Sequence, residues 1–455
     1  MLERVKSLFS KNVNSLKKQV SNFYGNEDKQ KYLVLTIVCM SLFLDNMLYM
    51  VVIPIVPNYI QKFDNATVNS TSSEIVSGTS LKIGVLFASK AIVQLLVNPL
   101  SGTLLDRIGY NLPLMFGLVV IFISTTIFAF GESYGILFLA RSLQGVGSAF
   151  ADTASLAMIA ENYQNQVERS RAMGLAIACI SFGSLVAPPF GGFMYGLAGK
   201  ELPFLTLSLI ALVDALLLYP FVRTSLVSRR RRIESFQYTP IYRLFLDKNI
   251  AICAFCLVLA NVSLAFLEPT ISTWMDKIMS TSEYEIGLVW LPTFFPHVFG
   301  VYVAYKLNEQ YPDKNWLIAM VGLIIEGVSC LIVPFSTVYA SLMFPLMSLC
   351  FGIALVDTAI LPLLGQIVDL KYSGLYGCVY AIADISYSIA YALGPVVAGL
   401  VMGSIGFMWL NVLIFLSNVI YAPVLYFLSP THNYNTLEND KLEIARADFE
   451  QAEDF

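Results

Sequence analysis

A single carboxylate stands near the centre of a long apolar stretch. Asp357 lies in CFGIALVDTAILP, within an apolar run from about 339 to 367 that contains no Lys or Arg. A charge at the middle of a bilayer costs about 3 kcal/mol on insertion scales, so such residues usually mark a pathway or face a partner. Because desolvation favours the neutral form of an unpaired carboxyl, Asp357 is predicted to be an exchange site where a proton and a cation compete. Pro362 could break the helix below it.

Further acids fall inside apolar segments, and they outnumber the bases. This excess predicts a cationic substrate, protons, or both. Lys90 is expected to be the one deep base, and we expect it to pair with Asp384. Such a buried pair could fix helix packing or take part in coupling, since losing one partner costs several kcal/mol. The intramembrane acids are Asp45, Asp152, Asp214, Glu268, Glu326, Asp357 and Asp384.

The acids other than Asp357 carry different expectations. Asp45, on the first apolar segment, is expected either to handle protons or to be a satisfied acid at a helix contact. Asp152 occupies the position in an internal repeat that matches Asp357, which favours a structural role left by duplication. Asp214 and Glu326 have no motif around them, so interior hydrogen bonding or contact with water is expected for both.

Aromatic side chains could complete a cation site. A quaternary ammonium ion binds over aromatic faces by cation–π attraction, most strongly over Trp. The candidates are Trp290, Tyr380, Tyr387 and Tyr391. Trp290 could also anchor the membrane interface, where Trp and Tyr are enriched. His297, on the same segment, is expected to be a packing residue rather than a proton relay.

The composition defines the class of protein. Of 455 residues, 56% are hydrophobic and 13% are charged, against roughly 25% charged in soluble proteins. We therefore expect an all-α polytopic membrane protein. The chain has no GxxxxGK[ST] or HExxH motif and no nucleophile–base or metal-ligand constellation, which argues against ATP-driven transport, a metal site and an enzyme. The seven cysteines fall in apolar segments and are expected to be free and buried.

Twelve segments are long enough to cross a bilayer as helices, which takes about 20 apolar residues each. The expected spans are 33–60, 81–104, 112–130, 135–160, 172–196, 204–223, 249–272, 284–306, 315–333, 339–367, 375–402 and 407–429. A basic segment between spans six and seven divides them into two halves. The predicted organisation is a tail at 1–32, an N-terminal half at 33–223 with an outer loop at 61–80, a basic linker at 224–248, a C-terminal half at 249–429 and an acidic tail at 430–455.

The basic residues of the short loops predict the orientation of the chain. The N-terminal tail, the RRRR run at 229–232 and the loops after spans two and four place Lys and Arg on one side, which is the cytosolic side by the positive-inside rule. Both termini are then cytosolic. The first outer loop carries two glycosylation sequons, at Asn65 and Asn69. The N-terminus lacks a signal-peptide core, so the first span is expected to stay uncleaved.

The two predicted halves resemble each other in sequence. FADTASL, residues 150–156, matches LVDTAIL, residues 355–361, and SLVAPPFGG matches YALGPVVAG further along each half. Such internal repeats are typical of transporters whose substrate site lies between the halves near the membrane midplane. They argue against a channel or a non-transporting receptor, which is the alternative from another class.

Two short motifs resemble those of the major facilitator superfamily. GTLLDRIGYN, with Asp106 and Arg107, is similar to its G-x-x-x-D-R-x-G loop. GSLVAPPFGG, from Gly183 to Gly192, resembles its fifth-helix antiporter motif, in which small residues let helices approach closely and Pro188 bends the helix. The resemblance implies twelve transmembrane helices in two pseudo-symmetric six-helix halves.

Longer stretches resemble the vesicular amine transporters, which are proton antiporters of that superfamily. They include LDNMLYMVVIPIVPNYI, RSLQGVGSAFADT, CFGIALVDTAILP and VYAIADISYSIAYALGP. The acetylcholine-carrying members are the most similar. The resemblance implies loading of cytosolic acetylcholine into synaptic vesicles in exchange for lumenal protons, by alternating access and without a cofactor. A monoamine or multidrug/proton antiporter is the alternative within transport, against which Asp152 and the VDTAILP context weigh.

The family resemblance also implies roles for individual residues. Asp357 would be the key acid, with Trp290 and the tyrosines of span eleven near the substrate. Glu326 departs from the family pattern and receives no role. The remaining implied features are a Lys90–Asp384 ion pair and positions around the cavity for Asp45, Asn261 and Glu268.

The expected partners follow from the same features. They are a small cation, protons and the lipid bilayer, and we expect a monomer that does not bind nucleic acid. The segment from Tyr434 to Leu437 fits the Y-x-x-Φ pattern of sorting signals, which predicts an adaptor contact. The tail that carries it is acidic and expected to be disordered.

Overall fold

The computed structural model describes residues 27–52, 55, 72–235, 241–279, 289–372 and 375–429. Within these ranges, the side chains of 27–29, 72–83, 223–235, 272, 273 and 395 are not described. The predicted sequons at Asn65 and Asn69, most of the N-terminal tail and the acidic tail with Tyr434–Leu437 lie outside the described residues.

The described residues form an all-helical structure, and each predicted span has its own long helix. This confirms the predicted fold class. The long helices are α2 (Glu27–Met50), α4 (Ser72–Ile108), α5 (Asn111–Phe130), α6 (Tyr134–Asn162), α7 (Gln166–Ala198), α8 (Glu201–Ser235), α10 (Lys248–Met279), α12 (Phe294–Gln310), α13 (Asn315–Ile332), α14 (Tyr339–Lys371), α15 (Tyr376–Ser404) and α16 (Phe407–Tyr421). The shorter elements are α9 (Ile241–Leu246), η1 (Leu291–Thr293), η2 (Pro312–Lys314), η3 (Val333–Phe335) and η4 (Ala422–Leu428).

Ten of these helical segments are apolar and long enough to cross a membrane. The two long helices outside that set are α6 and α12. The first buries several polar side chains, among them Arg141, Gln144 and Ser148, and the second is only 17 residues long. Burial of polar groups inside the bundle explains how α6 belongs to a membrane fold without being uniformly apolar.

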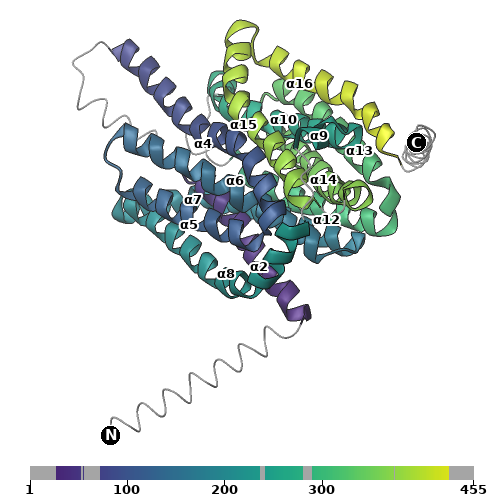
Figure 1. Cartoon of the computed structure of the whole chain (residues 1–455). Helices are drawn as coiled ribbons and strands as arrows, with labels where there is room; N and C mark the ends of the chain where they lie inside the picture. Colours follow the sequence, from purple (N-terminus) through teal and green to yellow (C-terminus); the bar gives the residue numbers. More distant parts are fainter. Residues whose placement is uncertain are drawn as a thin grey trace, which may run out of the picture.

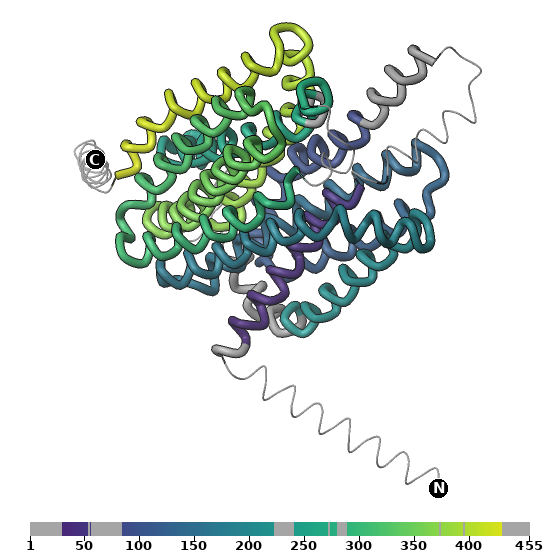
Figure 2. The backbone as a smooth tube through the Cα atoms, turned by 180° about the vertical axis from the view of Figure 1, so that it is seen from behind, coloured from purple at the N-terminus to yellow at the C-terminus, as the bar shows by residue number. Residues whose placement is uncertain are grey.

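The helices form two halves that lie side by side (Figure 1). In the N-terminal half, α5 packs on α6 and α8, and α2 packs on α7. In the C-terminal half, α13 packs on α14 and α16, and α12 packs on α14. The halves meet where α4 packs on α15 and where α7 packs on α12 and α14. The view from behind shows the same division of the chain by colour (Figure 2).

Several boundaries differ from the predicted ones. The helix expected to end at 223 continues to Ser235, and α9 lies within the predicted basic linker. In α14, Pro362 does not break the helix, which runs without interruption from Tyr339 to Lys371. A proline removes one backbone donor and crowds the preceding turn, but tertiary packing on α12 and α13 holds this helix continuous.

The small residues of the fifth-helix motif do not all serve close packing. A Cβ added at Gly183 would lie 2.7 Å from the carbonyl oxygen of Phe43 on α2, so this glycine is needed where α7 crosses α2. A Cβ at Gly192 would meet no described atom within 4 Å. The close approach further along α7 involves Gly191 instead, whose Cβ would lie 2.6 Å from Val51. The packing explanation therefore applies to Gly183 and not to Gly192.

We expect Gly183→Ala to lower the thermal unfolding midpoint of the purified protein. The added methyl group must push α2 and α7 apart, which costs about 1–3 kcal/mol. The matched control is Gly192→Ala on the same helix, which should be neutral or slightly stabilising because Ala favours helix over Gly by about 1 kcal/mol. Equal effects of the two substitutions would show that the α2–α7 crossing is looser than described.

Candidate substrate and proton site

A buried ion pair joins two helices of the N-terminal half. Lys90 on α4 places its Nζ 2.7 Å from Oδ2 of Asp45 on α2, and the Ser148 hydroxyl on α6 donates to the other carboxylate oxygen. Lys90 and Asp45 are only 4% and 8% exposed. The pair therefore combines an opposite charge with a hydrogen bond, as buried charges require.

The expected Lys90–Asp384 ion pair is wrong as a direct contact. Asp384 on α15 instead accepts two hydrogen bonds from the amide of Gln94, at 2.9 and 3.1 Å. The same Gln94 amide lies 3.2 Å from Oδ2 of Asp152 on α6. Lys90 and Gln94 lie on the same face of α4 but one turn apart along it, so they reach partners at different heights. A neutral amide with two N–H groups can bridge two carboxyls, which a search for opposite charges overlooks.

The group of charged residues around the Lys90–Asp45 pair, called the N-terminal cluster below, contains more acids than Lys90 can neutralise. Asp45, Asp152 and Asp384 interact electrostatically with one another and with Lys90. Carboxyls that share a site cannot all ionise at low cost. Asp384 and Gln94 place this cluster at the boundary between the two halves.

Sequence reasoning missed a second buried base beside this cluster. Arg141 on α6 is 1% exposed, and its Nη1 donates to Oε1 of Gln144 at 2.6 Å. Its guanidinium also lies 5.9 Å from the ring centre of Tyr49. The polar residues of α6 at 141, 144, 148 and 152 recur every three or four positions, which is the signal of one helix face that could have revealed Arg141.

Asp357 lies in the C-terminal half, where it has no basic partner among the described residues. It is 7% exposed and accepts a hydrogen bond from the Tyr387 hydroxyl on α15 at 3.2 Å. Asn261 on α10 lies beside the same carboxyl. The geometry leaves one carboxylate available to a cation or a proton.

One face of α15 connects the two clusters. Asp384 contacts Gln94 of the N-terminal half, and Tyr387, three residues further, contacts Asp357. Positions three and four apart share a helix face, so Tyr391 follows on the same face. Its ring meets that of Tyr49 on α2 edge to face, with centroids 5.7 Å apart. Both halves thus contribute aromatic groups next to the acids.

Glu268 lies further along the same region. It is half-buried on α10, and it interacts electrostatically with Tyr49 and Tyr391. Its carboxyl has no hydrogen-bond partner within the described ranges. Glu268 and the Tyr49–Tyr391 ring pair therefore lie together, next to Tyr387 and Asp357.

Three further residues named from the sequence make no contact with Asp357 within the described ranges. The Tyr380 hydroxyl donates to the Leu361 carbonyl at 3.0 Å, two turns along α15 from Tyr387. Trp290 precedes η1 and packs against the apolar cluster that contains residues of α10, α14 and α16. His297 on α12 has no described partner for its Nε2.

Inter-half contacts gather at the helix ends that are predicted to be cytosolic. Asp106, from the D-R loop, accepts the backbone N–H groups of Gly377 and Cys378 at 2.6 and 2.8 Å, so it caps the N-terminus of α15, where the helix dipole favours an anion. Arg107, its neighbour, is exposed. Arg169 on α7 adds an ion pair with Asp369 on α14, at 2.7 Å.

The end of α14 is tied to the start of α10. Lys371 lies 3.1 Å from the Asp247 carboxylate, and the Tyr372 hydroxyl donates to the same group at 3.0 Å. Burial and the nearby Asp247 carboxylate raise the pKa of Tyr372, so this phenol stays protonated as a donor. These contacts fix the helix ends on the same side as the Arg169 ion pair.

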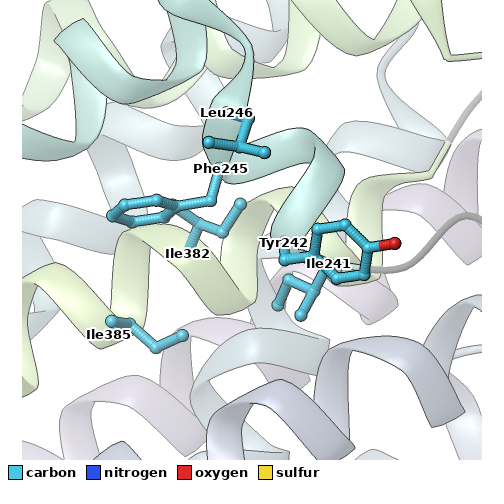
Figure 3. Close-up of a pocket in the computed structure, with 6 residues that line it drawn as sticks. All are labelled: Ile241, Tyr242, Phe245, Leu246, Ile382 and Ile385. Carbon is cyan, nitrogen blue, oxygen red and sulfur yellow. The ribbon is translucent and has the colours of Figure 1, made fainter.

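An apolar hollow of about 280 Å³ lies between α9 and α15 (Figure 3). Its lining includes Tyr242, Phe245, Ile382 and Ile385, and the two isoleucines flank Asp384 on α15. The lining presents no charged side chain, so this hollow does not suit a small cation.

The fold and the acids at the boundary between the halves define a membrane transporter. Residues 36–383 match the family model described as Major Facilitator Superfamily, and the chain therefore belongs to this superfamily. The human organic anion transporter MFSD10 (TETRAN) has a similar structure, with a TM-score of 0.70 at 17% identity over 88% of this chain and 99% of that one.

Three curated relatives narrow the family further. The Caenorhabditis elegans protein named vesicular acetylcholine transporter unc-17 is 49% identical, over 93% of this chain and 83% of that protein. The vesicular acetylcholine transporter of Rattus norvegicus is 50% identical, over 88% and 83%. A Danio rerio protein named probable vesicular acetylcholine transporter-B is 53% identical, over 89% and 80%. Within the superfamily, the chain is a member of the vesicular acetylcholine transporter family.

Proposed function

We propose that this chain is a proton-coupled antiporter that loads cytosolic acetylcholine into synaptic vesicles in exchange for lumenal protons. The observation that carries the proposal is the Asp357 carboxyl, which is buried, bonded to Tyr387 and unpaired with any described base. We infer acetylcholine as the substrate from the names of the relatives. No cofactor is needed, because the proton gradient drives the exchange.

The chemistry of the substrate requires exchange at a carboxylate. Acetylcholine carries a permanent positive charge, so it cannot be released by gaining or losing a proton. A carboxylate that holds the cation can instead be protonated from the acidic lumen, which removes the attraction. In this scheme Asp357 binds the ammonium group, and Tyr387, Tyr391 and Tyr49 offer aromatic faces nearby.

The energy in the gradient is sufficient for accumulation. Each pH unit supplies about 1.4 kcal/mol per proton, so two protons across one unit support roughly 100-fold accumulation of a neutral solute. Net movement of charge adds about 2.3 kcal/mol per charge for each 100 mV of membrane potential. The N-terminal cluster of Asp45, Asp152 and Asp384 is a second place where protons bind in this scheme.

We further propose that the chain acts as a monomer with both termini in the cytosol. Glycosylation at Asn65 and Asn69 and an adaptor contact through Tyr434–Leu437 belong to the same proposal. The Asp106 cap and the Arg169–Asp369 pair then close the cytosolic side. In this scheme, the described conformation is closed toward the cytosol.

Breaking the Arg169–Asp369 pair should favour opening of that cytosolic side. In Asp369→Asn, amide hydrogen exchange in the first turn of α15 is expected to become several-fold faster, because a charge-assisted link between the halves is lost. The control is Lys306→Ala, which removes an exposed pair with Glu309 within α12 and links no halves. Unchanged exchange in Asp369→Asn would contradict the assignment of this pair to closure.

Substrate competition tests the proposed specificity. Proteoliposomes with an acidic interior should take up labelled acetylcholine, and unlabelled acetylcholine should inhibit this uptake at lower concentration than a monoamine. Preferential uptake of the monoamine would keep the fold and the antiport but replace the substrate. A current proportional to voltage, without proton coupling, would support a channel instead.

A further inference from the structure

Glu326 is a fully buried acid of the C-terminal half that the transport scheme above does not use. It lies on α13 with 0% exposure. Its Oε2 accepts hydrogen bonds from Asn418 on α16 at 3.3 Å and from Ser263 on α10 at 3.4 Å. Its Oε1 has no hydrogen-bond partner, and no cationic side chain forms an ion pair with it, among the residues that the structure describes.

Neighbouring helices leave a fitted space for this side chain. A Cβ added at Gly352 on α14 would lie 2.8 Å from Cγ of Glu326. Gly352 precedes Asp357 by five residues on the same helix. Three helices thus surround the acid. On α14, Gly352 has no side chain and leaves room for it, while α10 and α16 each donate a hydrogen bond to its Oε2. Such donors stabilise a carboxylate once it forms.

Glu326 and Asp357 contact the same two helices. Ser263, which donates to Glu326, and Asn261, which lies beside Asp357, are two residues apart on α10, and Glu326 packs against Gly352 on α14, the helix that carries Asp357. Two buried acids this close, without a described cation between them, cannot both ionise at low cost. The other titratable groups that interact with Glu326 are thiols, and none is cationic: Cys256 on α10, Cys350 on α14 and Cys330 on its own helix.

We propose that Glu326 is a second proton-binding carboxyl of the transport cycle, whose occupancy follows the charge at Asp357. This rests on the proposed exchange at Asp357. While Asp357 is a bare carboxylate, repulsion keeps the proton on Glu326. When the substrate cation neutralises Asp357, the O–H bond of Glu326 ionises, the proton passes to water, and Ser263 and Asn418 donate to the resulting carboxylate. Lumenal acid reverses the step.

Proton release on substrate binding tests this inference. Acetylcholine is added to the detergent-solubilised full chain in weakly buffered solution, and the protons released per bound cation are measured across a pH series. Glu326→Gln should bind acetylcholine but release up to about one proton fewer per cation. The matched control is Asp214→Asn, a buried acid of α8 whose carboxyl oxygens have no described partner. It should leave the ratio unchanged.

The outcomes separate this inference from the proposed function. Absence of proton release from the wild type would overturn the exchange at Asp357 itself. If the wild type releases protons and Glu326→Gln releases the same number per bound acetylcholine, only the role of Glu326 is overturned. A merely structural role would lower binding and release together and so leave this ratio unchanged. If Glu326→Gln does not fold, Asn418→Ala removes one donor to the carboxylate and should move the pH midpoint of release upward. An unchanged midpoint would also overturn the proposal.

Discussion

Asp357→Asn is expected to abolish acetylcholine uptake driven by a pH gradient. The amide has the size of the carboxyl and can still accept the Tyr387 hydrogen bond, but it can neither attract a cation nor exchange a proton. Loss of one partner of a buried charge pair costs about 2–5 kcal/mol, which corresponds to a loss of roughly 30-fold to several thousand-fold. Uptake of labelled acetylcholine into proteoliposomes measures this loss.

The matched variant Asp357→Glu separates charge from shape. It keeps an exchangeable carboxyl but moves it by one methylene, so part of the uptake should remain. Tyr387→Phe removes only the hydrogen bond to Asp357 and should have a smaller effect than Asp357→Asn. Full coupled uptake in Asp357→Asn would eliminate Asp357 as the exchange site.

Lys90→Ala is expected to be the most destabilising of the charge substitutions in the N-terminal half. It leaves the buried Asp45 carboxylate without its cation, and breaking a buried pair in this way costs about 3–5 kcal/mol. The thermal unfolding midpoint of the purified protein should fall markedly.

Double substitutions identify the true partner of Lys90. Lys90→Ala combined with Asp45→Asn removes both charges of the observed pair and should recover much of the lost stability. Lys90→Ala combined with Asp384→Asn should not, because Gln94 rather than Lys90 binds Asp384. Recovery by the Asp384 combination alone would restore the pairing that the sequence suggested.

The positions of the spans could be predicted because each needs only a local apolar run of sufficient length. The sequence also shows directly that the apolar run around Asp357 contains no Lys or Arg. The surroundings from other helices were not predictable. Tyr387 was named as a candidate, but Tyr380 lies two turns away on the same helix, and only the height of each residue along α15 relative to α14 shows that Tyr387 reaches Asp357.

The partner of Lys90 could not be predicted because the depth of each residue in the bundle and the rotation of each helix determine which acid Lys90 reaches. Asp45, Asp152 and Asp384 were all available, and the structure shows that one turn of α4 separates Lys90 from Gln94. The sequence gives no sign that a neutral amide would bind two acids. Likewise, Gly183 and Gly192 look equivalent in the motif, and only the crossing with α2 distinguishes them.

The most direct test of exchange measures both ions in one preparation. Proteoliposomes without a starting pH gradient are loaded with acetylcholine, and internal pH is followed while the cation leaves into acetylcholine-free medium. The antiport scheme predicts that the interior becomes acidic as acetylcholine leaves, and that Asp357→Asn shows neither movement. Exit of acetylcholine with no change in internal pH would contradict proton exchange while leaving transport itself in place.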